Sequence, residues 1–203
     1  MNKKQVERYF KTLSKIYAGR CRIILTGAAA GALYGRVRAT MDIDFSAEAA
    51  DWENFSRAVE ETSARTGIAA QYAEDIDRWS SITLMDYKKH TFIYGRFGQV
   101  EVRLMEPSYW AIGKLSRYLD PDIGDLVKVF RKTGTPWREA ASVAGRALHE
   151  SPKSSACFLF RRQTEDFFKR FGKKVWGRTF DAKEAITHFH RRAKIKPKAK
   201  RIP

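Results

Sequence analysis

Apolar residues recur along the chain with the two periods that distinguish strands from helices. Ile23, Ile24 and Leu25 form a short apolar run that is typical of a buried strand. Three later segments alternate apolar and polar residues, as half-buried strands do: 81–86, 90–95 and 99–104. Gly95 and Gly98 bracket the expected hairpin connection between the last two. We therefore expect a small β-sheet in the first half of the chain.

Helical spacing of apolar residues dominates most of the remaining sequence. The expected helices cover residues 3–18, 49–65, 109–119, 122–132, 135–150 and 154–171, and a last one begins near Asp181. Five phenylalanines of the later helices are assigned to the core: Phe158, Phe160, Phe167, Phe168 and Phe171. The pattern predicts an α+β (α/β) protein, with a small mixed β-sheet flanked by helices over residues 1–105, a helical region over 106–190 and a basic tail over 191–203.

The segment from residue 23 to residue 46 carries the first candidate chemistry. Because side chains alternate across a strand, Asp42 and Asp44 point to one face, roughly 7 Å apart, while Ile43 and Phe45 face the core. Two carboxylates on an open face suit Mg²⁺, which prefers carboxylate oxygens together with substrate phosphates. D-x-D alone is a frequent coincidence, so the neighbouring residues decide its meaning.

A turn of small residues precedes the two aspartates. Gly27 allows the backbone to approach a ligand closely, and the alanines that follow place N–H groups at a helix N-terminus, where phosphate binds well. An alanine-rich run is also simply a good helix former. The order of strand, turn, helix, two arginines and D-x-D favours a joint site for a metal ion and a triphosphate.

These residues resemble the motif of the nucleotidyltransferase superfamily, which is a Gly-Gly or Gly-Ser turn, a helix and then D-x-D. The resemblance is greatest to the bacterial branch that contains the AbiEii-type abortive-infection toxins and related uncharacterised domains. The matching residues are Gly27, Ala30, Gly35, Arg38, Thr40, Asp42, Ile43 and Asp44. Ala28 stands where relatives have a second Gly or a Ser, so a side-chain contact to phosphate is missing.

The resemblance implies transfer of a nucleoside monophosphate from an NTP to a hydroxyl, with Mg²⁺ (or Mn²⁺) as cofactor and with pyrophosphate leaving. Asp42 and Asp44 are then metal ligands, and Glu101 completes the metal site or acts as the base. The other interpretation of Glu101 is an exposed carboxylate paired with Arg103 on an edge strand. The turn and the residues before D-x-D are assigned to the nucleotide: Gly27, Ala28, Arg38 and Thr40.

A second signature lies where two predicted helices meet. Lys114, Arg117, Asp122 and Asp125 follow the pattern K-L-x-R-x-x-x-x-D-x-x-D-L, which resembles a signature of the AbiEii-like branch. The resemblance implies that Lys114 neutralises triphosphate charge, and that Asp122 or Asp125 orients this lysine or the base and ribose. The alternative is a set of interhelical salt bridges, which are common and individually weak.

The formal net charge of +16 is concentrated in the last quarter of the chain. Residues 1–150 contain 23 Lys and Arg against 19 Asp and Glu, whereas residues 151–203 contain 16 against 4. An arm that follows RNA phosphates and a solubilising terminus are the two interpretations of this tail. The residues expected to contact RNA are Lys173, Lys174, Arg191, Arg192, Lys194, Lys196, Lys198, Lys200 and Arg201.

Composition and charge narrow the remaining choices. No apolar run approaches the roughly 18 residues of a membrane span, and the charged start does not resemble a signal peptide. We expect a cytoplasmic protein with NTP and RNA as substrates, and the resemblance implies a tRNA-like acceptor and an antitoxin partner. A catalytically silent nucleic-acid-binding module is the first alternative. An antibiotic nucleotidyltransferase is the second, and the basic charge disfavours it because a cationic substrate needs an acidic cleft.

Overall fold

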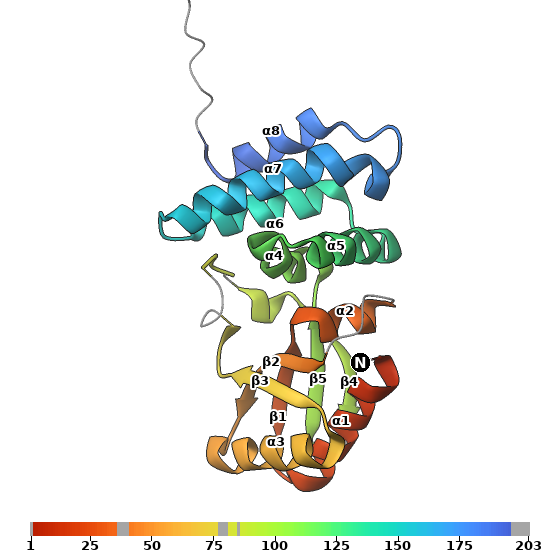
Figure 1. Cartoon of the computed structure of the whole chain (residues 1–203). Coiled ribbons are helices and arrows are strands. Elements are labelled where there is room, and N and C mark those ends of the chain that lie inside the picture. Colours follow the sequence, from red (N-terminus) through yellow and green to blue (C-terminus); the bar gives the residue numbers. More distant parts are fainter. Residues whose placement is uncertain (1, 36–40, 77–80, 85, 196–203) are drawn as a thin grey trace, which may run out of the picture.

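The computed structural model describes residues 2–35, 41–76, 81–84 and 86–195 (Figure 1). Its five described strands form one mixed sheet in the order β3-β2-β1-β5-β4. β1 is parallel to β5 and antiparallel to β2, β2 is parallel to β3, and β4 and β5 form an antiparallel hairpin. The strands are β1 (Cys21–Leu25), β2 (Asp42–Ala49), β3 (Ala69–Ala73), β4 (Thr91–Phe97) and β5 (Val100–Met105).

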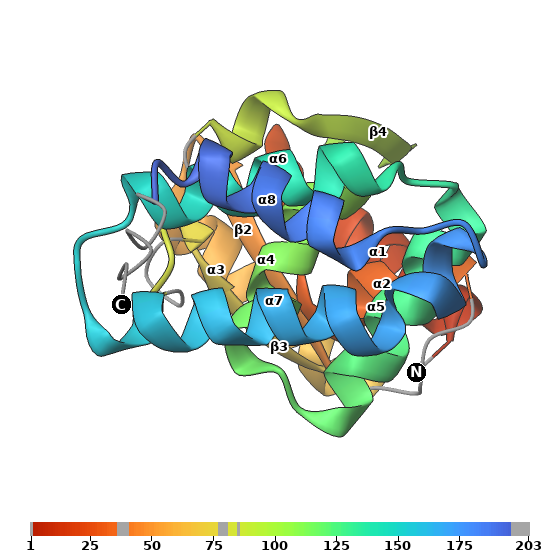
Figure 2. The ribbon, with the colours of Figure 1, turned by 90° about the horizontal axis from the view of Figure 1, so that it is seen from above.

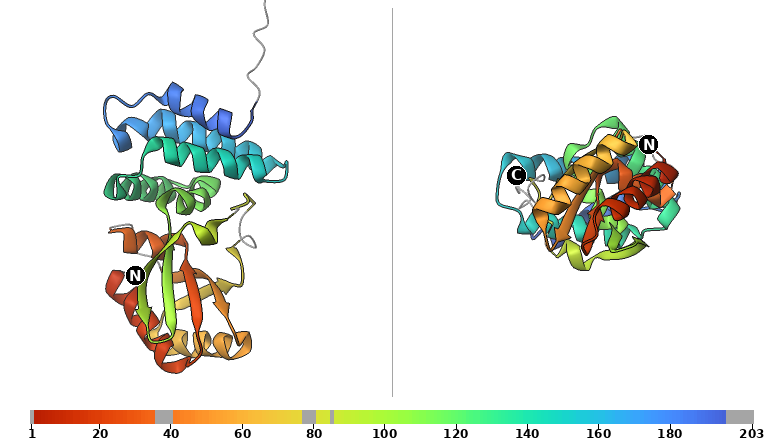
Figure 3. Two further views of the ribbon diagram at one scale, coloured as in Figure 1. Left: turned by 180° about the vertical axis from the view of Figure 1, so that it is seen from behind. Right: turned by 90° about the horizontal axis from the view of Figure 1, so that it is seen from below.

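Two helices cover the apolar face of this sheet: α1 (Lys3–Ile16) and α3 (Trp52–Thr66). The ring of Phe45 on β2 lies 6.2 Å from that of Phe10 on α1 and 6.4 Å from that of Phe55 on α3, centroid to centroid. Seen from below, α1 and α3 lie side by side (Figure 3). Ile43 and Phe45 are fully buried, as predicted, so the aspartates that alternate with them point to the opposite, polar face.

Among the described residues, six further α-helices and the short 3-10 helix η2 (Tyr87–Lys89) complete the fold. The short α2 (Gly27–Gly35) joins β1 to the segment before β2, and the rest of the helices stack beyond the sheet (Figure 1). Seen from above, α7 and α8 lie side by side, and α8 covers α6 while α7 packs on α4 and α5 (Figure 2). The bounds are α4 (Pro107–Arg117), α5 (Asp120–Thr133), α6 (Trp137–Glu150), α7 (Ser155–Trp176) and α8 (Ala182–Arg192).

The predicted mixed α+β class is confirmed, but one predicted strand is wrong and one strand was missed. Residues 81–84 form no strand in the described structure. Their alternation reflects burial of Ile82 and Leu84, while the N–H of Thr83 donates to Ser151 Oγ at 2.8 Å instead of to a ladder. The missed strand is β3, whose alanine-rich sequence carries a weak strand signal.

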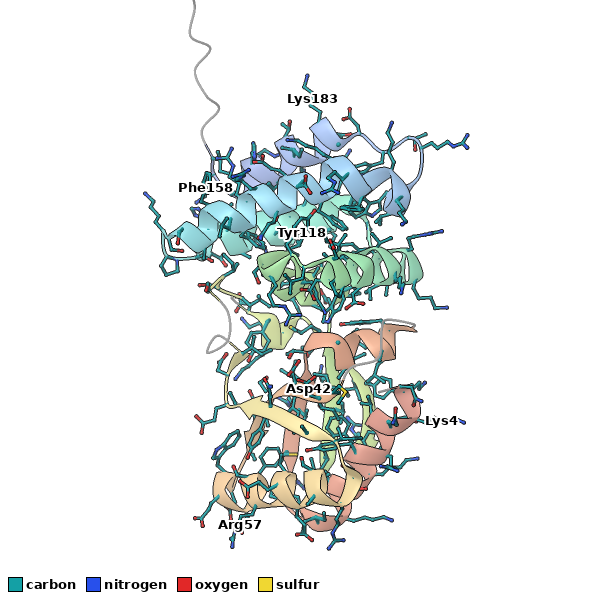
Figure 4. The ribbon with its side chains drawn as sticks, viewed as in Figure 1. Lys4, Asp42, Arg57, Tyr118, Phe158 and Lys183 are labelled. Carbon is teal, nitrogen blue, oxygen red and sulfur yellow. The ribbon has the colours of Figure 1, made fainter. Side chains whose placement is uncertain are left out.

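Helix positions agree with the sequence better than helix ends do. α4 begins at Pro107 with Glu106 at the cap position, two residues before the expected start at Tyr109. α7 continues past Gly172 to Trp176, because a Cβ at Gly172 would lie 2.0 Å from the ring of Phe180 and the glycine is needed for packing. Phe158 was wrongly assigned to the core, since it is 59% exposed (Figure 4). None of the described helices is long and apolar enough to cross a membrane.

Candidate active site at the end of strand β1

The turn between β1 and α2 is built around the carboxylate of Asp44. The N–H of Thr26 donates to the carbonyl oxygen of Asp44 at 2.8 Å. Gly27 has a φ of +58°, which favours glycine, and a Cβ built on it would lie 2.0 Å from Asp44 Oδ2. Any side chain at position 27 would therefore displace this carboxylate.

A cleft of about 200 Å³ opens beside this turn, between the sheet and α4. Trp110 on α4 forms one wall, and its Nε1–H donates to the carbonyl oxygen of Gly27 at 2.8 Å. The cleft combines apolar walls with a few polar groups, as small-molecule sites do. Its charged or amide side chains are Asp44, Gln71, Lys114 and Arg117, and its large apolar ones are Ile76, Leu84, Met105, Tyr109 and Trp110.

Asp42 and Asp44 share the polar face of β2, on the side of the sheet where α4 and α5 stack (Figure 4). Burial raises the pKa of Asp44 above its usual range, and the charge of Asp42 raises it further, while Arg117 and Lys114 oppose the change. Two carboxylates that repel each other in this way would be relieved by a bound cation. The pair therefore fits the oxygen ligands that Mg²⁺ prefers.

The described residues place no third metal ligand in a cluster with this pair. In the described part of the chain, no group of three or more His, Cys, Asp or Glu residues could hold a metal ion. A magnesium ion held by Asp42 and Asp44 would need phosphate oxygens and water to complete its shell, which is how Mg²⁺ commonly binds in phosphate-transfer sites.

The structure does not bring Glu101, the predicted third carboxylate, beside Asp42 and Asp44. On β5, Glu101 lies opposite Arg22 of β1. Asp44 of β2 lies opposite Thr26, which is four residues further along the chain from Arg22. The offset is about 13 Å along the strands, with two strand spacings of about 5 Å each across the sheet. Glu101 instead accepts from Arg103 at 2.9 Å and from Arg96 at 3.1 Å, and these bonds hold its pKa below the usual range.

Met105 occupies the place on β5 that lies level with Asp44. Leu25 pairs with Leu104, so the next residue on β5 stands beside Thr26. Met105 is 3% exposed and lines the cleft. The strand therefore offers a thioether at the level where the expected third carboxylate would be useful.

Lys114, Asp122 and Asp125 form a buried ion network between α4 and α5. Lys114 Nζ donates to Asp122 Oδ1 and to Asp125 Oδ2, both at 2.9 Å, and each of the three side chains is at most 2% exposed. Burial alone would raise the pKa of Asp122, but hydrogen bonds from Arg117 and Lys114 outweigh it and lower the pKa. The interhelical salt-bridge alternative thus describes the geometry of Lys114, which also lines the cleft.

Arg117 is the cation of this network that reaches solvent. Its side chain is 54% exposed, and it donates to Asp122 Oδ1 from Nη2 at 2.7 Å and to Asp122 Oδ2 from Nε at 3.2 Å. Lys114 is occupied by two carboxylates, whereas the guanidinium of Arg117 is held on one side only. Arg117 is therefore better placed than Lys114 to meet a ligand in the cleft.

The other sequence-predicted residues are distributed as follows. Ala28 is buried, and Thr26 and Gly27 line the cleft in its place. Arg38 and Thr40 lie outside the described residues, as do four positions of the tail: Lys196, Lys198, Lys200 and Arg201. The remaining predicted RNA contacts are exposed on α7, on α8 and just beyond it: Lys173, Lys174, Arg191, Arg192 and Lys194.

Sequence reasoning missed the aromatic wall of the cleft. Trp110 lies four residues before Lys114, which places both on one side of α4, and Lys114 Nζ lies 5.6 Å from the centroid of the Trp110 ring. The four-residue spacing of Trp110 and Lys114 was the sequence signal that could have predicted this wall. Gln71 was missed with its strand; it lies opposite Asp44 in the β2–β3 ladder.

Comparison of the chain with family models, with curated proteins and with solved structures finds no match.

Proposed function

We propose that the chain is a nucleotidyltransferase that moves a nucleoside monophosphate from an NTP to a hydroxyl acceptor. The observation that carries the proposal is the contact between the Gly27 turn and Asp44, at the mouth of a cleft that also contains cationic side chains. A carboxylate pair, a glycine turn and basic groups are the parts that phosphate transfer needs, since its catalysis is mainly positioning and charge stabilisation.

The carboxylates of Asp42 and Asp44 are the proposed ligands of Mg²⁺ or Mn²⁺. When bound, such an ion neutralises phosphate charge and orients the triphosphate. Gly27 leaves room for Asp44, and the first N–H groups of α2 have no acceptor within the helix, so they favour an anion at this end. Trp110 keeps the turn in place through its hydrogen bond to the Gly27 carbonyl oxygen.

Arg117 is the proposed phosphate contact from the helical region. Asp122 holds its guanidinium at the cleft, and Lys114, which also donates to Asp125, holds Asp122 in turn. In this arrangement Lys114 is a positioning residue rather than a ligand of the nucleotide, in contrast to the role implied by the family resemblance. The side chain that meets the phosphates is the exposed arginine.

RNA is the proposed acceptor, because the positive charge of the chain matches a polyanion. A toxin paired with an antitoxin stays an implication of the family resemblance. The catalytically silent module is the competing proposal, and it predicts nucleic-acid affinity without any metal-dependent reaction.

The test is transfer of label from each of the four α-labelled NTPs to a pool of small RNA, with Mg²⁺ and with a chelator. We expect Mg²⁺-dependent labelling of RNA with at least one NTP. Labelling that is absent with all four NTPs, alongside retained RNA binding, would favour the silent module instead.

A further inference from the structure

A second concave surface lies on α5, on the side opposite the ion network. Asp122 and Asp125 face α4, whereas Ile123, Gly124 and Val127 lie about half a helical turn around α5 and form the floor of an open groove. Its walls are α5, the C-terminal part of α7 and the end of α2. We call it the α5 groove; its remaining lining residues are Gly35, Asp120, Lys128, Arg131, Lys132, Phe171 and Lys174.

The basic residues of the α5 groove are exposed and are not neutralised by the protein. Within the described part of the chain, no salt bridge or side-chain hydrogen bond engages Lys128, Arg131, Lys132 or Lys174. Asp120 is the single acidic residue among the described lining residues. This differs from the polar face of the sheet, where the arginines around Glu101 are paired. The groove therefore has a positive charge that is available to a ligand.

The shape of the groove and its aromatic ring restrict the kind of anion that it could bind. A Cβ at Gly124 would meet nothing within 4 Å, so the floor is open above this residue. Phe171 is half-buried and lines the groove, and its ring lies 5.8 Å from that of Phe167, which anchors it to the core. A basic groove that also presents an anchored aromatic ring suits a strand of phosphates with stackable bases better than it suits a simple anion.

The α5 groove is connected to the candidate active site through α2. Atoms Cε and Cγ of Lys132 would both lie 3.6 Å from a Cβ built on Gly35, the last residue of α2. Gly27, at the other end of α2, contacts Asp44. Eight helical steps of 1.5 Å place the two ends about 12 Å apart.

We propose that the α5 groove binds single-stranded nucleic acid, with its basic residues on the sugar–phosphate backbone and Phe171 stacked on a base. Binding does not depend on the proposed function. That the bound strand is the acceptor does rest on it, since only then does the short path along α2 lead the strand to the reacting phosphate.

The experiment measures fluorescence anisotropy of short labelled oligouridine and oligothymidine with the full-length protein at several salt concentrations. The test variant is Lys128→Ala/Arg131→Ala/Lys132→Ala. Each lost phosphate contact removes about 0.7 from the slope of log K against log salt, so we expect the slope to flatten by about 2 and affinity to fall about 100-fold at 0.1 M salt. Oligouridine and oligothymidine distinguish RNA from DNA as the preferred strand.

The matched control is Lys4→Ala/Lys153→Ala/Lys183→Ala, which removes the same charge from exposed positions outside the groove. Lys183 projects from the top of the view in Figure 4 and Lys4 from its right-hand side. The tail is present in both variants, so its contribution cancels. An equal change in the two triple variants would overturn the proposal, because binding would then follow net charge alone.

Two further arms test the nature of the ligand. Phe171→Leu is expected to weaken oligonucleotide binding about tenfold at an unchanged salt slope, since only stacking is lost. Polyglutamate, which has charge without bases, should bind weakly and respond to the two triple variants alike. Tight polyglutamate binding that the groove variant abolishes would overturn the proposal in favour of an acidic protein. Asp44→Asn should leave oligonucleotide affinity unchanged, so failure of transfer and failure of this proposal are separate outcomes.

Discussion

Two clusters of charged residues each contain a carboxylate from the same polar face of the sheet, Asp44 in one and Glu101 in the other. The two carboxylates differ in burial and in their hydrogen-bond partners. The cluster at the cleft combines Asp44 with Lys114, Arg117 and two buried aspartates of α5. The cluster around Glu101 lies near the other end of β1, where Arg22, Arg96 and Arg103 surround one carboxylate. In the first cluster, Asp44 lies against the Gly27 turn and beside the apolar walls of the cleft. In the second, Glu101 pairs with three arginines.

Two properties therefore distinguish the candidate site from a surface ion network: the position of the carboxylate along its strand, and whether protein cations already neutralise it. The pKa of Asp44 is raised by burial and by Asp42, whereas the pKa of Glu101 is lowered by hydrogen bonds from Arg103 and Arg96. Binding of a cation would stabilise the ionised form of a carboxylate whose pKa is raised. A carboxylate whose pKa is lowered is already stabilised in its ionised form by neighbouring cations of the protein.

The largest expected contrast is in activity. Asp42→Asn and Asp44→Asn should each lower the rate of nucleotide transfer at least about 10³-fold, because losing a metal ligand costs about 4 kcal/mol of transition-state stabilisation. Glu101→Gln, made in parallel, should stay within about threefold of wild type. Rates of labelled NTP transfer under single-turnover conditions measure both. Equal losses in Asp44→Asn and Glu101→Gln would remove the distinction between the two clusters.

The next contrast is in stability. Lys114→Met keeps most of the side-chain volume but removes the ammonium group that donates to the buried carboxylates of Asp122 and Asp125, which should cost about 3 kcal/mol or more. Glu101→Gln should cost no more than about 1 kcal/mol, since two of its three arginine partners, Arg22 and Arg96, are more than half exposed. Urea unfolding monitored by circular dichroism gives both values. A Lys114→Met protein as stable as wild type would show that the network is not buried in solution.

A smaller contrast concerns two arginines that each hold a carboxylate. Arg117→Gln should raise the KM for NTP about tenfold with little change in kcat, which corresponds to loss of one charge-assisted hydrogen bond. Arg117→Lys should recover part of this loss. Arg96→Gln, the control from the Glu101 cluster, should leave KM unchanged. A normal KM in Arg117→Gln would assign the phosphates to another group.

The smallest effect is a change in the pH dependence of stability. Because the folded-state pKa of Asp44 is raised, its favourable contribution is present below the unfolded-state pKa and is lost as pH rises through the folded-state value. Asp44→Asn should therefore be slightly more stable than wild type at neutral pH, and this difference should vanish in acid. For Asp122 the sign is reversed, because its pKa is lowered and its contribution is lost as pH falls. Denaturant unfolding across pH measures both.

Local sequence patterns predicted the parts of this site that depend on alternation. Asp42 and Asp44 share one face because Ile43 and Phe45 must be buried, and the small residues after β1 allow α2 to pack closely. Helix α1 follows from the apolar spacing of Val6, Tyr9, Phe10 and Leu13, all of which are buried. These features need no knowledge of the fold.

Long-range register was beyond the same reasoning. Alternation placed Glu101 on the correct face, but only the ladder between β1 and β5 decides that it stands beside Arg22 and not beside Asp44. Likewise, the spacing of Lys114, Asp122 and Asp125 suggested one cluster, whereas their burial depends on how α4 meets α5. The α5 groove requires α2, α5 and α7 together, so no single helix predicts it.

The proposal that Asp42 and Asp44, and not Glu101, hold a metal ion is tested most directly by locating that ion. Electron paramagnetic resonance measures bound Mn²⁺ in the presence of a non-hydrolysable NTP, for wild type, Asp44→Asn and Glu101→Gln side by side. The account predicts an NTP-dependent Mn²⁺ site in wild type and Glu101→Gln that is lost in Asp44→Asn. A site that survives Asp44→Asn, or that disappears in Glu101→Gln, would contradict it.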